Sequence, residues 1–108
     1  MTKAKMQLQE AKAKILKALA HPTRVYIVET LVHGEKCVCE FVDEVGGDFS
    51  TISKHLSILK NAGIVQIDKR GQNVFYSLKT PCILDFLGCI EDVIKHNLKE
   101  QSSLFEHK

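Results

Sequence analysis

The stretch Asp48–Val65, DFSTISKHLSILKNAGIV, decides the fold of this chain. Its apolar residues recur every three or four positions, which is the spacing of one face of a helix. These residues are Phe49, Ile52, Leu56 and Leu59. Asp48 suits the N-cap position, and Ala62-Gly63 suits the end of a helix. The stretch therefore predicts a helix over residues 49–61, with an opposite face of hydroxyl and cationic side chains.

The segments on either side of this helix complete a larger unit. Upstream, apolar residues predict a shorter helix over about residues 37–45, which two glycines end. Downstream, the pattern predicts two short strands over 64–68 and 74–78. The basic segment 69–73 between them holds a glycine, as a hairpin tip requires. Two short helices joined by a tight glycine turn and followed by a basic hairpin describe a winged helix-turn-helix.

Further helices are predicted at both ends of the chain. Apolar residues at helical spacing predict one over about 3–20 and another from Pro22 to about His33. The chain breaks between these two, because the residue before a proline avoids the helical region. A last helix with a wide apolar stripe is predicted over about 81–99. The predicted order is ααααββα, a mainly α chain with a small β-hairpin (α+β), in which residues 1–108 form one domain.

The polar face of the helix over 49–61 has the chemistry that the major groove of DNA requires. That groove is about 12 Å wide and presents hydrogen-bonding base edges. Short hydroxyl side chains and a few cations near the helix N-terminus suit it, and the terminus itself attracts phosphates. The wing, over about 64–78, would contact the neighbouring backbone or the minor groove. The predicted DNA-binding residues are Ser50, Thr51, Ser53, Lys54, His55, Lys69, Arg70, Gln72 and Asn73.

Charge is distributed unevenly along the chain. The formal net charge is only +2, but residues 1–24 carry +5, residues 25–48 carry −5, residues 49–79 carry +4 and residues 80–108 carry −2. A protein of modest total charge meets an anionic polymer well if its contact face is basic. The predicted helix and wing lie in a basic stretch, so the pattern favours double-stranded DNA as a partner.

The composition excludes several classes of protein. With 108 residues, 44% hydrophobic and 26% charged, the chain has an ordinary globular composition. It has no apolar run near the ~18 residues of a membrane span, and its charged N-terminus lacks the apolar core of a signal peptide. We therefore predict a cytoplasmic protein with no membrane partner, whose four cysteines are reduced.

Four motifs resemble those of the ArsR/SmtB family of metal-responsive repressors. Leu16–Arg24 resembles the start of that family's second helix, and Ser50–Val65 is similar to its recognition helix. Arg70–Leu78 matches its wing, and EKCVCEF at Glu35–Phe41 resembles its ELCVCDL metal-binding box. The resemblance spans about residues 10–98. It implies a homodimeric repressor whose first and last helices form the dimer interface and which leaves operator DNA when an inducer binds.

The resemblance also implies a metal site at Cys37 and Cys39. Thiolates bind soft ions, so As(III) or Sb(III) is the favoured inducer, and no cofactor is obligatory. Residues i and i+2 lie about 200° apart on a helix, so both thiolates face one ion only if the helix begins or loosens at Cys37. The box often has a third cysteine, which here is Val42. The site therefore needs ligands from elsewhere.

Two other cysteines are candidates for completing that site, within or between protomers. Cys82 and Cys89 are seven residues apart and so about 10 Å apart along a helix, unless the helix begins after Cys82. With four thiolates, Cd(II) or Zn(II) is an alternative ion. The alternative role for this pair is that of small core or interface residues.

Other functions stay open at this stage. An oxidant or a persulfide could act on the same fold by closing a disulfide between two of the cysteines. A thiol enzyme would need a positioned base or a resolving partner, and because no such motif is evident we predict that the protein is not an enzyme. The family's second site, D-x-H with a later H-x-x-E, is not predicted, because Asp85 is followed by Leu87 and His96 by Lys99. Surface positions are expected for His21, His33 and His107.

Overall fold

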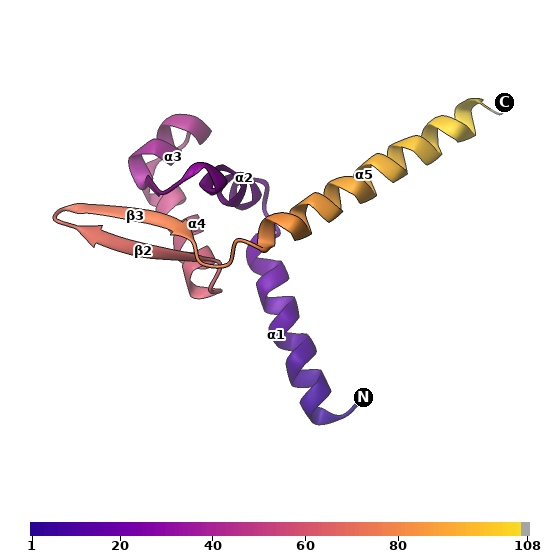
Figure 1. The fold of residues 1–108 in the computed structure, drawn as a ribbon, viewed down its shortest axis with the longest axis horizontal. Helices are drawn as coiled ribbons and strands as arrows, with labels where there is room; N and C mark the ends of the chain where they lie inside the picture. The colour runs from indigo at the N-terminus through magenta and orange to yellow at the C-terminus, as the bar shows by residue number, and fades with distance from the viewer. Residues whose placement is uncertain (107–108) are drawn as a thin grey trace.

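The structure, a computed structural model, describes residues 1–106, with side chains as far as residue 102. Its elements are α1 (Lys3–Leu19), α2 (Pro22–Thr30), a 3-10 turn η1 (Leu31–His33), β1 (Lys36–Cys37), α3 (Val38–Val45), α4 (Phe49–Asn61), β2 (Val65–Arg70), β3 (Asn73–Leu78) and α5 (Ile83–Glu106). In Figure 1, α2, α3, α4 and the hairpin form a globular unit, and α1 and α5 project from it as two arms. These elements confirm the predicted winged helix-turn-helix. His107, which was predicted to lie on the surface, is outside the described residues.

The core lies inside the globular unit, with α4 at its centre. Seven side chains are almost completely buried, namely Ile27, Val28, Phe41, Ile52, Leu56, Leu59 and Val65. Three of the four apolar residues predicted for one face of α4 are among them. The fourth, Phe49, is 62% exposed, so its predicted burial is wrong. Phe49 is the first residue of α4, and its side chain lines a surface groove beside α3.

The sheet has three strands, where the sequence predicted two. β1 pairs antiparallel with β3, and the strand order is β1-β3-β2. β1 has only two residues, which is too short to produce a period-two pattern. In the hairpin Arg70 pairs with Asn73, so the turn is only Gly71-Gln72. The predicted tip over 69–73 was therefore too long, and Gly71 supplies the positive φ, +63°, at the turn.

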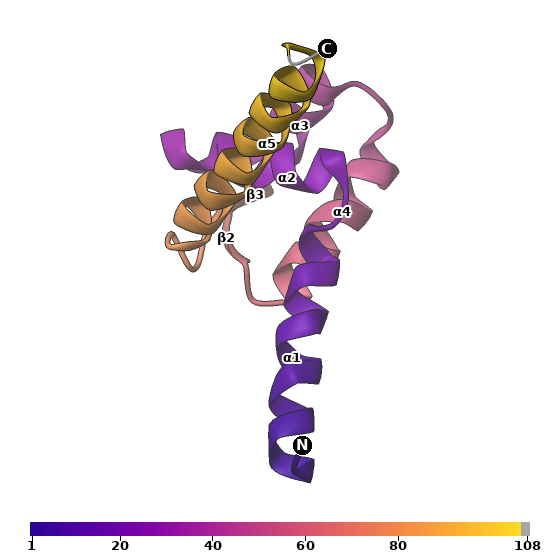
Figure 2. The same cartoon turned by 90° about the vertical axis from the view of Figure 1, so that its right-hand side faces the viewer.

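The two arms expose most of their apolar residues. On α1 these are Met6, Leu8, Ile15 and Leu16, and on α5 they are Phe86, Ile90, Val93, Ile94 and Leu98. Of the predicted α5 stripe, only Leu87 is buried. α5 also continues to Glu106, beyond its predicted end near residue 99, and Figure 2 shows it pointing away from α1. Among the described residues, no helix has both the length and the apolar composition to cross a membrane.

Candidate nucleic-acid interface

The side-chain carboxylate of Asp48 caps the N-terminus of α4. The Oδ1 atom of Asp48 accepts hydrogen bonds from the backbone N–H of Thr51 at 2.7 Å and from the hydroxyl of Ser50 at 3.1 Å. Hydrogen bonds from Thr51 and then Ser50 lower the pKa of Asp48, so this carboxyl is ionised at neutral pH. The anionic cap stabilises the start of the helix but competes with the phosphate that the sequence predicted there.

The predicted DNA-binding side chains of α4 differ in exposure. Ser50, Thr51 and Lys54 are exposed, and Ser53 is half-buried. These residues lie on the face of α4 opposite the buried Leu56 and Leu59, as the helical period predicts. α4 therefore presents two hydroxyls and a cation to solvent, which is the combination expected of a helix that enters a major groove.

His55 has a different environment from the other predicted DNA-binding residues. Its ring is half-buried and lies 4.5 Å from the ring of His21, measured between centroids. The Nε atom of Arg24 donates to its Nδ1 atom at 3.2 Å. Burial lowers the pKa of His55, and the nearby charges of His21, Arg24 and Lys54 lower it further. This side chain is directed into the protein, which the sequence did not predict because a polar residue beside Lys54 suits a solvated face.

The predicted DNA-binding residues of the wing lie on the surface, but one of them, Arg70, already forms ion pairs within the protein. Lys69, Arg70, Gln72 and Asn73 are all exposed. The guanidinium of Arg70 donates to the carboxylates of Glu35 and, at 2.9 Å, Asp68. These hydrogen bonds raise the pKa of Arg70. A phosphate would have to compete with two carboxylates for this side chain, whereas Lys69 forms no ion pair with the side chains described, those of residues 1–102.

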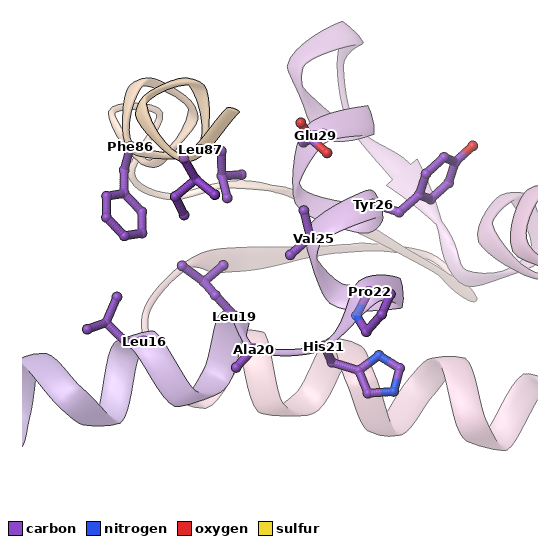
Figure 3. A pocket seen from close by; sticks show the side chains of 11 residues that line it. Leu16, Leu19, Ala20, His21, Pro22, Val25, Tyr26, Glu29, Phe86 and Leu87 are labelled. Atoms are coloured by element: carbon purple, nitrogen blue, oxygen red, sulfur yellow. The ribbon is translucent and has the colours of Figure 1, made fainter. Parts of the chain in front are cut away.

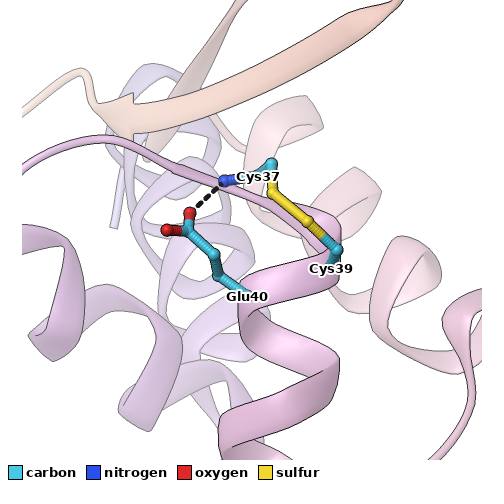
Figure 4. The surroundings of a disulfide bond; sticks show 3 residues. All are labelled: Cys37, Cys39 and Glu40. Atoms are coloured by element: carbon cyan, nitrogen blue, oxygen red, sulfur yellow. Dashed lines mark hydrogen bonds between the residues drawn. A yellow bond between two sulfur atoms is a disulfide. The ribbon is translucent and has the colours of Figure 1, made fainter.

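Cys37 and Cys39 are joined in a disulfide, so the prediction of four reduced thiols is wrong for this pair. Cys37 is extended, at φ −90° and ψ 167°, and is the N-cap of α3. This geometry lets two sulfurs at i and i+2 face each other, as the sequence required. The carboxylate of Glu40 accepts from the backbone N–H of Cys37 at 2.8 Å and fixes the start of the helix (Figure 4).

The structure does not bring the other two cysteines to this pair. Cys82 precedes the first residue of α5 and Cys89 lies on that helix, and both are exposed free thiols. Exposure argues against the alternative that they are core residues of a single chain. Among the described residues, no cluster of three or more His, Cys, Asp or Glu side chains is arranged to hold a metal ion. A four-thiolate site within one chain is therefore not formed, and a site between protomers stays a prediction.

A groove of about 350 Å³ connects the cysteine pair to the predicted DNA-binding surface. Ser53 of α4 and Gln72 and Asn73 of the wing line one part of it, and Cys37 and Cys39 line another. The remaining lining residues are Val38, Phe49, Val74 and Tyr76. The sequence assigned no role to these four, because their apolar character predicted the core. α4, the wing and the disulfide thus share one groove.

A second, larger groove lies where the arms meet α2. It measures about 590 Å³, and its lining is mainly apolar. Figure 3 shows Leu16 and Leu19 of α1 facing Phe86 and Leu87 of α5, with Val25 of α2 beside them. His21 also lines this groove. It is half-buried and caps α2 through its Nδ1 atom, so its predicted surface position is wrong in part. His33 is exposed, as predicted.

Comparison with known proteins agrees with this arrangement. Residues 21–66 match the family described as "Bacterial regulatory protein, arsR family". An uncharacterized HTH-type transcriptional regulator of Methanocaldococcus jannaschii is 37% identical over 89 residues, which are 82% of this chain and 100% of that protein. The HTH-type transcriptional repressor SmtB of Mycobacterium tuberculosis is 39% identical over 72 residues, covering 67% of this chain and 53% of the repressor.

Solved structures give the same result for the fold. The homodimeric winged helix-turn-helix DNA-binding domain of a possible ArsR-family regulator from Mycobacterium bovis superposes with a TM-score of 0.79. It is 26% identical, and the match covers 91% of each chain. These relatives are named as transcriptional regulators or repressors, which agrees with the prediction that the chain is not an enzyme.

Proposed function

The chain belongs to the ArsR/SmtB family of winged helix-turn-helix transcriptional repressors, and from this premise we propose how it binds DNA and what releases it. It binds operator DNA as a homodimer, with α4 in the major groove and the wing on the neighbouring backbone. A thiophilic metal(loid) ion, As(III) or Sb(III) before Cd(II) or Zn(II), binds at Cys37 and Cys39 and weakens that complex.

The observation that carries this proposal is the groove shared by α4, the wing and the cysteine pair. Ser53, Gln72 and Asn73 are predicted to contact DNA, and they line the same groove as Cys37 and Cys39. A change in the state of the sulfurs is therefore a change at the edge of the DNA-binding surface. Coupling between two such sites typically changes affinity by roughly 5- to 150-fold.

The proposed homodimer rests on the exposed apolar faces of the arms. Leu8 and Leu16 of α1 and Ile94 and Leu98 of α5 are each about half exposed in one chain. Large apolar side chains exposed along one helix in this way mark an interaction site. A twofold dimer built on these helices would present two copies of α4, which must lie about one DNA turn, ~34 Å, apart to bind neighbouring half-sites.

The donor set of one chain fits the proposed ion only in part. Cys37 and Cys39 supply two sulfurs, and their disulfide must first be reduced, because the thiolate is the ligand. Within the described residues, no third His, Cys, Asp or Glu joins them. The proposal therefore takes a further thiolate from Cys82 or Cys89 of a second chain.

A second candidate trigger is oxidation of the same pair, and the disulfide itself favours it. Closing the disulfide joins the two Sγ atoms, releases two protons and transfers two electrons to an oxidant such as a peroxide or a polysulfide. No further ligand is needed. In this scheme the reduced and oxidised forms of Cys37 and Cys39 differ in operator affinity, and the ion is not the signal.

The experiment uses the reduced chain and a DNA duplex that it selects from a random-sequence pool. We expect As(III) or Sb(III) to lower the affinity for this duplex by roughly 5- to 150-fold, and the double variant Cys37→Ser/Cys39→Ser to remove the response. Separate Cys82→Ser and Cys89→Ser variants identify the further ligand. If none of the four ions changes the affinity but peroxide does, oxidation is the trigger. If no duplex is selected, the proposed DNA binding is wrong.

A further inference from the structure

Three side chains meet where α1 ends, α2 begins and α4 passes beneath them. They are His21, Arg24 and His55, and they come from segments that are up to 34 residues apart in the sequence. All three are half-buried. His55 follows the exposed Thr51 by four residues on α4, so the cluster borders the predicted DNA-binding face.

Arg24 connects two helices through its guanidinium. Its Nη1 atom donates to the backbone carbonyl of Ala18 at 3.0 Å and to that of Lys17 at 3.4 Å. These carbonyls belong to the last turn of α1, where the helix leaves acceptors without partners and where a cation is favourable. The Nε atom donates to the Nδ1 atom of His55 on α4. One side chain therefore links the end of an arm to the recognition helix.

The hydrogen bonds make the Nδ1 atom of each imidazole an acceptor. The Nδ1 atom of His21 accepts from the backbone N–H of Thr23 at 3.0 Å, and the Nδ1 atom of His55 accepts from Arg24. A backbone N–H and a guanidinium N–H only donate, so each Nδ1 carries no proton. The ring of His55 is therefore neutral in this arrangement. An imidazolium has N–H on both nitrogens and would have no acceptor for Arg24.

The charged neighbours of His55 are all basic. Arg24 on α2 and His21 before that helix face its ring, and Lys54 is adjacent on α4. On the α1 side, Lys14 and Lys17 lie beside Arg24 around a small surface pocket. No carboxylate forms a hydrogen bond or an ion pair with the cluster in the part of the chain that the structure describes. A proton on His55 would therefore be repelled and would also displace Arg24.

We propose that Arg24 and His55 are positioning residues that hold the recognition helix against the end of α1, and that protonation of His55 opens this link and weakens operator binding. The inference rests on the proposed operator binding. Because α1 belongs to the proposed dimer interface, the link sets the angle at which each recognition helix leaves the dimer. Burial of His55 among basic groups keeps its pKa below the ordinary value, so the link is closed at neutral pH and opens as the pH falls.

The test compares the wild-type chain with His55→Asn, using the duplex selected from the random-sequence pool. Asn places an amide oxygen close to the position of the Nδ1 atom, so it accepts from Arg24 but does not titrate. We expect wild-type affinity to fall by roughly three- to tenfold, relative to His55→Asn, between about pH 7.5 and about pH 5.5. His33→Asn, which removes an exposed histidine outside the cluster, should keep the wild-type pH profile.

The outcomes separate this inference from the function on which it rests. Parallel pH profiles for the wild type and His55→Asn would overturn the inference while leaving operator binding intact. Failure of both proteins to bind the duplex at any pH would overturn the proposed function instead. A third result, a steeper profile in His55→Asn than in the wild type, also contradicts the inference, because the titrating group would then lie elsewhere.

A second variant tests the link from the arginine side. Arg24→Gln should lower operator affinity at neutral pH without changing the slope of log affinity against log salt, because a positioning role gives Arg24 no contact with a phosphate. Lys54→Gln, on the exposed face of α4, should reduce that slope by roughly 1.8, because the dimer loses two phosphate contacts that each contribute about 0.9. Circular dichroism and sedimentation confirm that each variant is folded and has the oligomeric state of the wild type. A reduced salt slope in Arg24→Gln would mean direct phosphate contact and would overturn the positioning role.

Discussion

The globular unit buries its large apolar residues, whereas the two arms expose most of theirs. Val28 and Leu56 in the unit are completely buried, whereas Ile94 and Leu98 on α5 are 52% and 61% exposed. All four were predicted from one pattern, an apolar stripe at helical spacing. The unit buries its apolar stripes within one chain, whereas those of the arms are left exposed and are proposed to pack against a second chain. An apolar stripe therefore predicts burial but does not say in which chain the burial occurs.

The largest effect is expected when a large side chain is removed from the core, and comparison with an exposed position tests the difference in burial. Phe41→Ala should lower the free energy of unfolding by about 3–5 kcal/mol, because Phe41 is completely buried and its removal leaves a cavity. Urea denaturation measures this loss. The matched control is Phe49→Ala, in which the same side chain is removed from an exposed position and the expected loss is below about 1 kcal/mol. Equal losses would mean that the core has been misplaced.

The next largest effect is expected on the arms. Ile94→Glu places a carboxylate in the proposed dimer interface, where burial of an unpaired charge is strongly unfavourable. The dimer dissociation constant should rise by roughly a hundredfold or more, as sedimentation velocity would show, while the helical content stays unchanged. Lys95→Glu introduces the same group at the adjacent polar position and should leave the dimer intact. A dimer that tolerates Ile94→Glu would show that α5 does not form the interface.

A smaller effect is expected at the junction of α4 with the sheet. Gly63 has φ +82°, and an added Cβ would meet no atom within 4 Å. Gly63→Ala should therefore cost about 1–2 kcal/mol through backbone strain alone. The loss should appear in urea denaturation and not depend on protein concentration, since Gly63 belongs to the globular unit. Gly88→Ala on α5, where φ is not positive, is the control and should not destabilise the protein.

The smallest effect concerns pH and the junction between unit and arm. The pKa of His55 is lowered in the folded protein from 6.5, so the unfolded chain binds more protons between the folded pKa and 6.5. The stability contributed by neutral His55 is complete above about pH 6.5 and is lost as the pH falls through the folded pKa. Urea midpoints measured across this window should fall in the wild type and change less in His55→Asn. The lowered pKa of Asp48 acts only at more acidic pH.

Much of the fold could be predicted from local pattern. The stripe of Ile52, Leu56 and Leu59 predicted α4 to within a residue at each end, and two glycines predicted the turn before it. β1 could not be predicted, because two residues carry no period and the strand exists only through its pairing with β3. The exposure of Phe49 could not be predicted either. Periodicity shows which face of a helix a residue lies on, but not whether a neighbouring element covers that face along the whole helix.

The candidate site was predictable in composition and less so in geometry. The CVC motif pointed to Cys37 and Cys39, and the structure brings these two sulfurs together without Cys82 or Cys89. His55 was expected among the DNA-binding residues, but its ring lies against His21 and Arg24. The sequence could not reveal this, because polar residues are compatible with solvent and with a buried hydrogen bond alike.

The sequence by itself determined the helices, the hairpin and their order, because hydrophobic period, proline and glycine act over a few residues along the chain. Only the tertiary structure decided which polar side chains face solvent and which face one another. The link from α1 through Arg24 to His55 spans more than 30 residues, and the groove joining the cysteine pair to α4 and the wing spans as many. Such contacts depend on how completed elements pack, which no local pattern records.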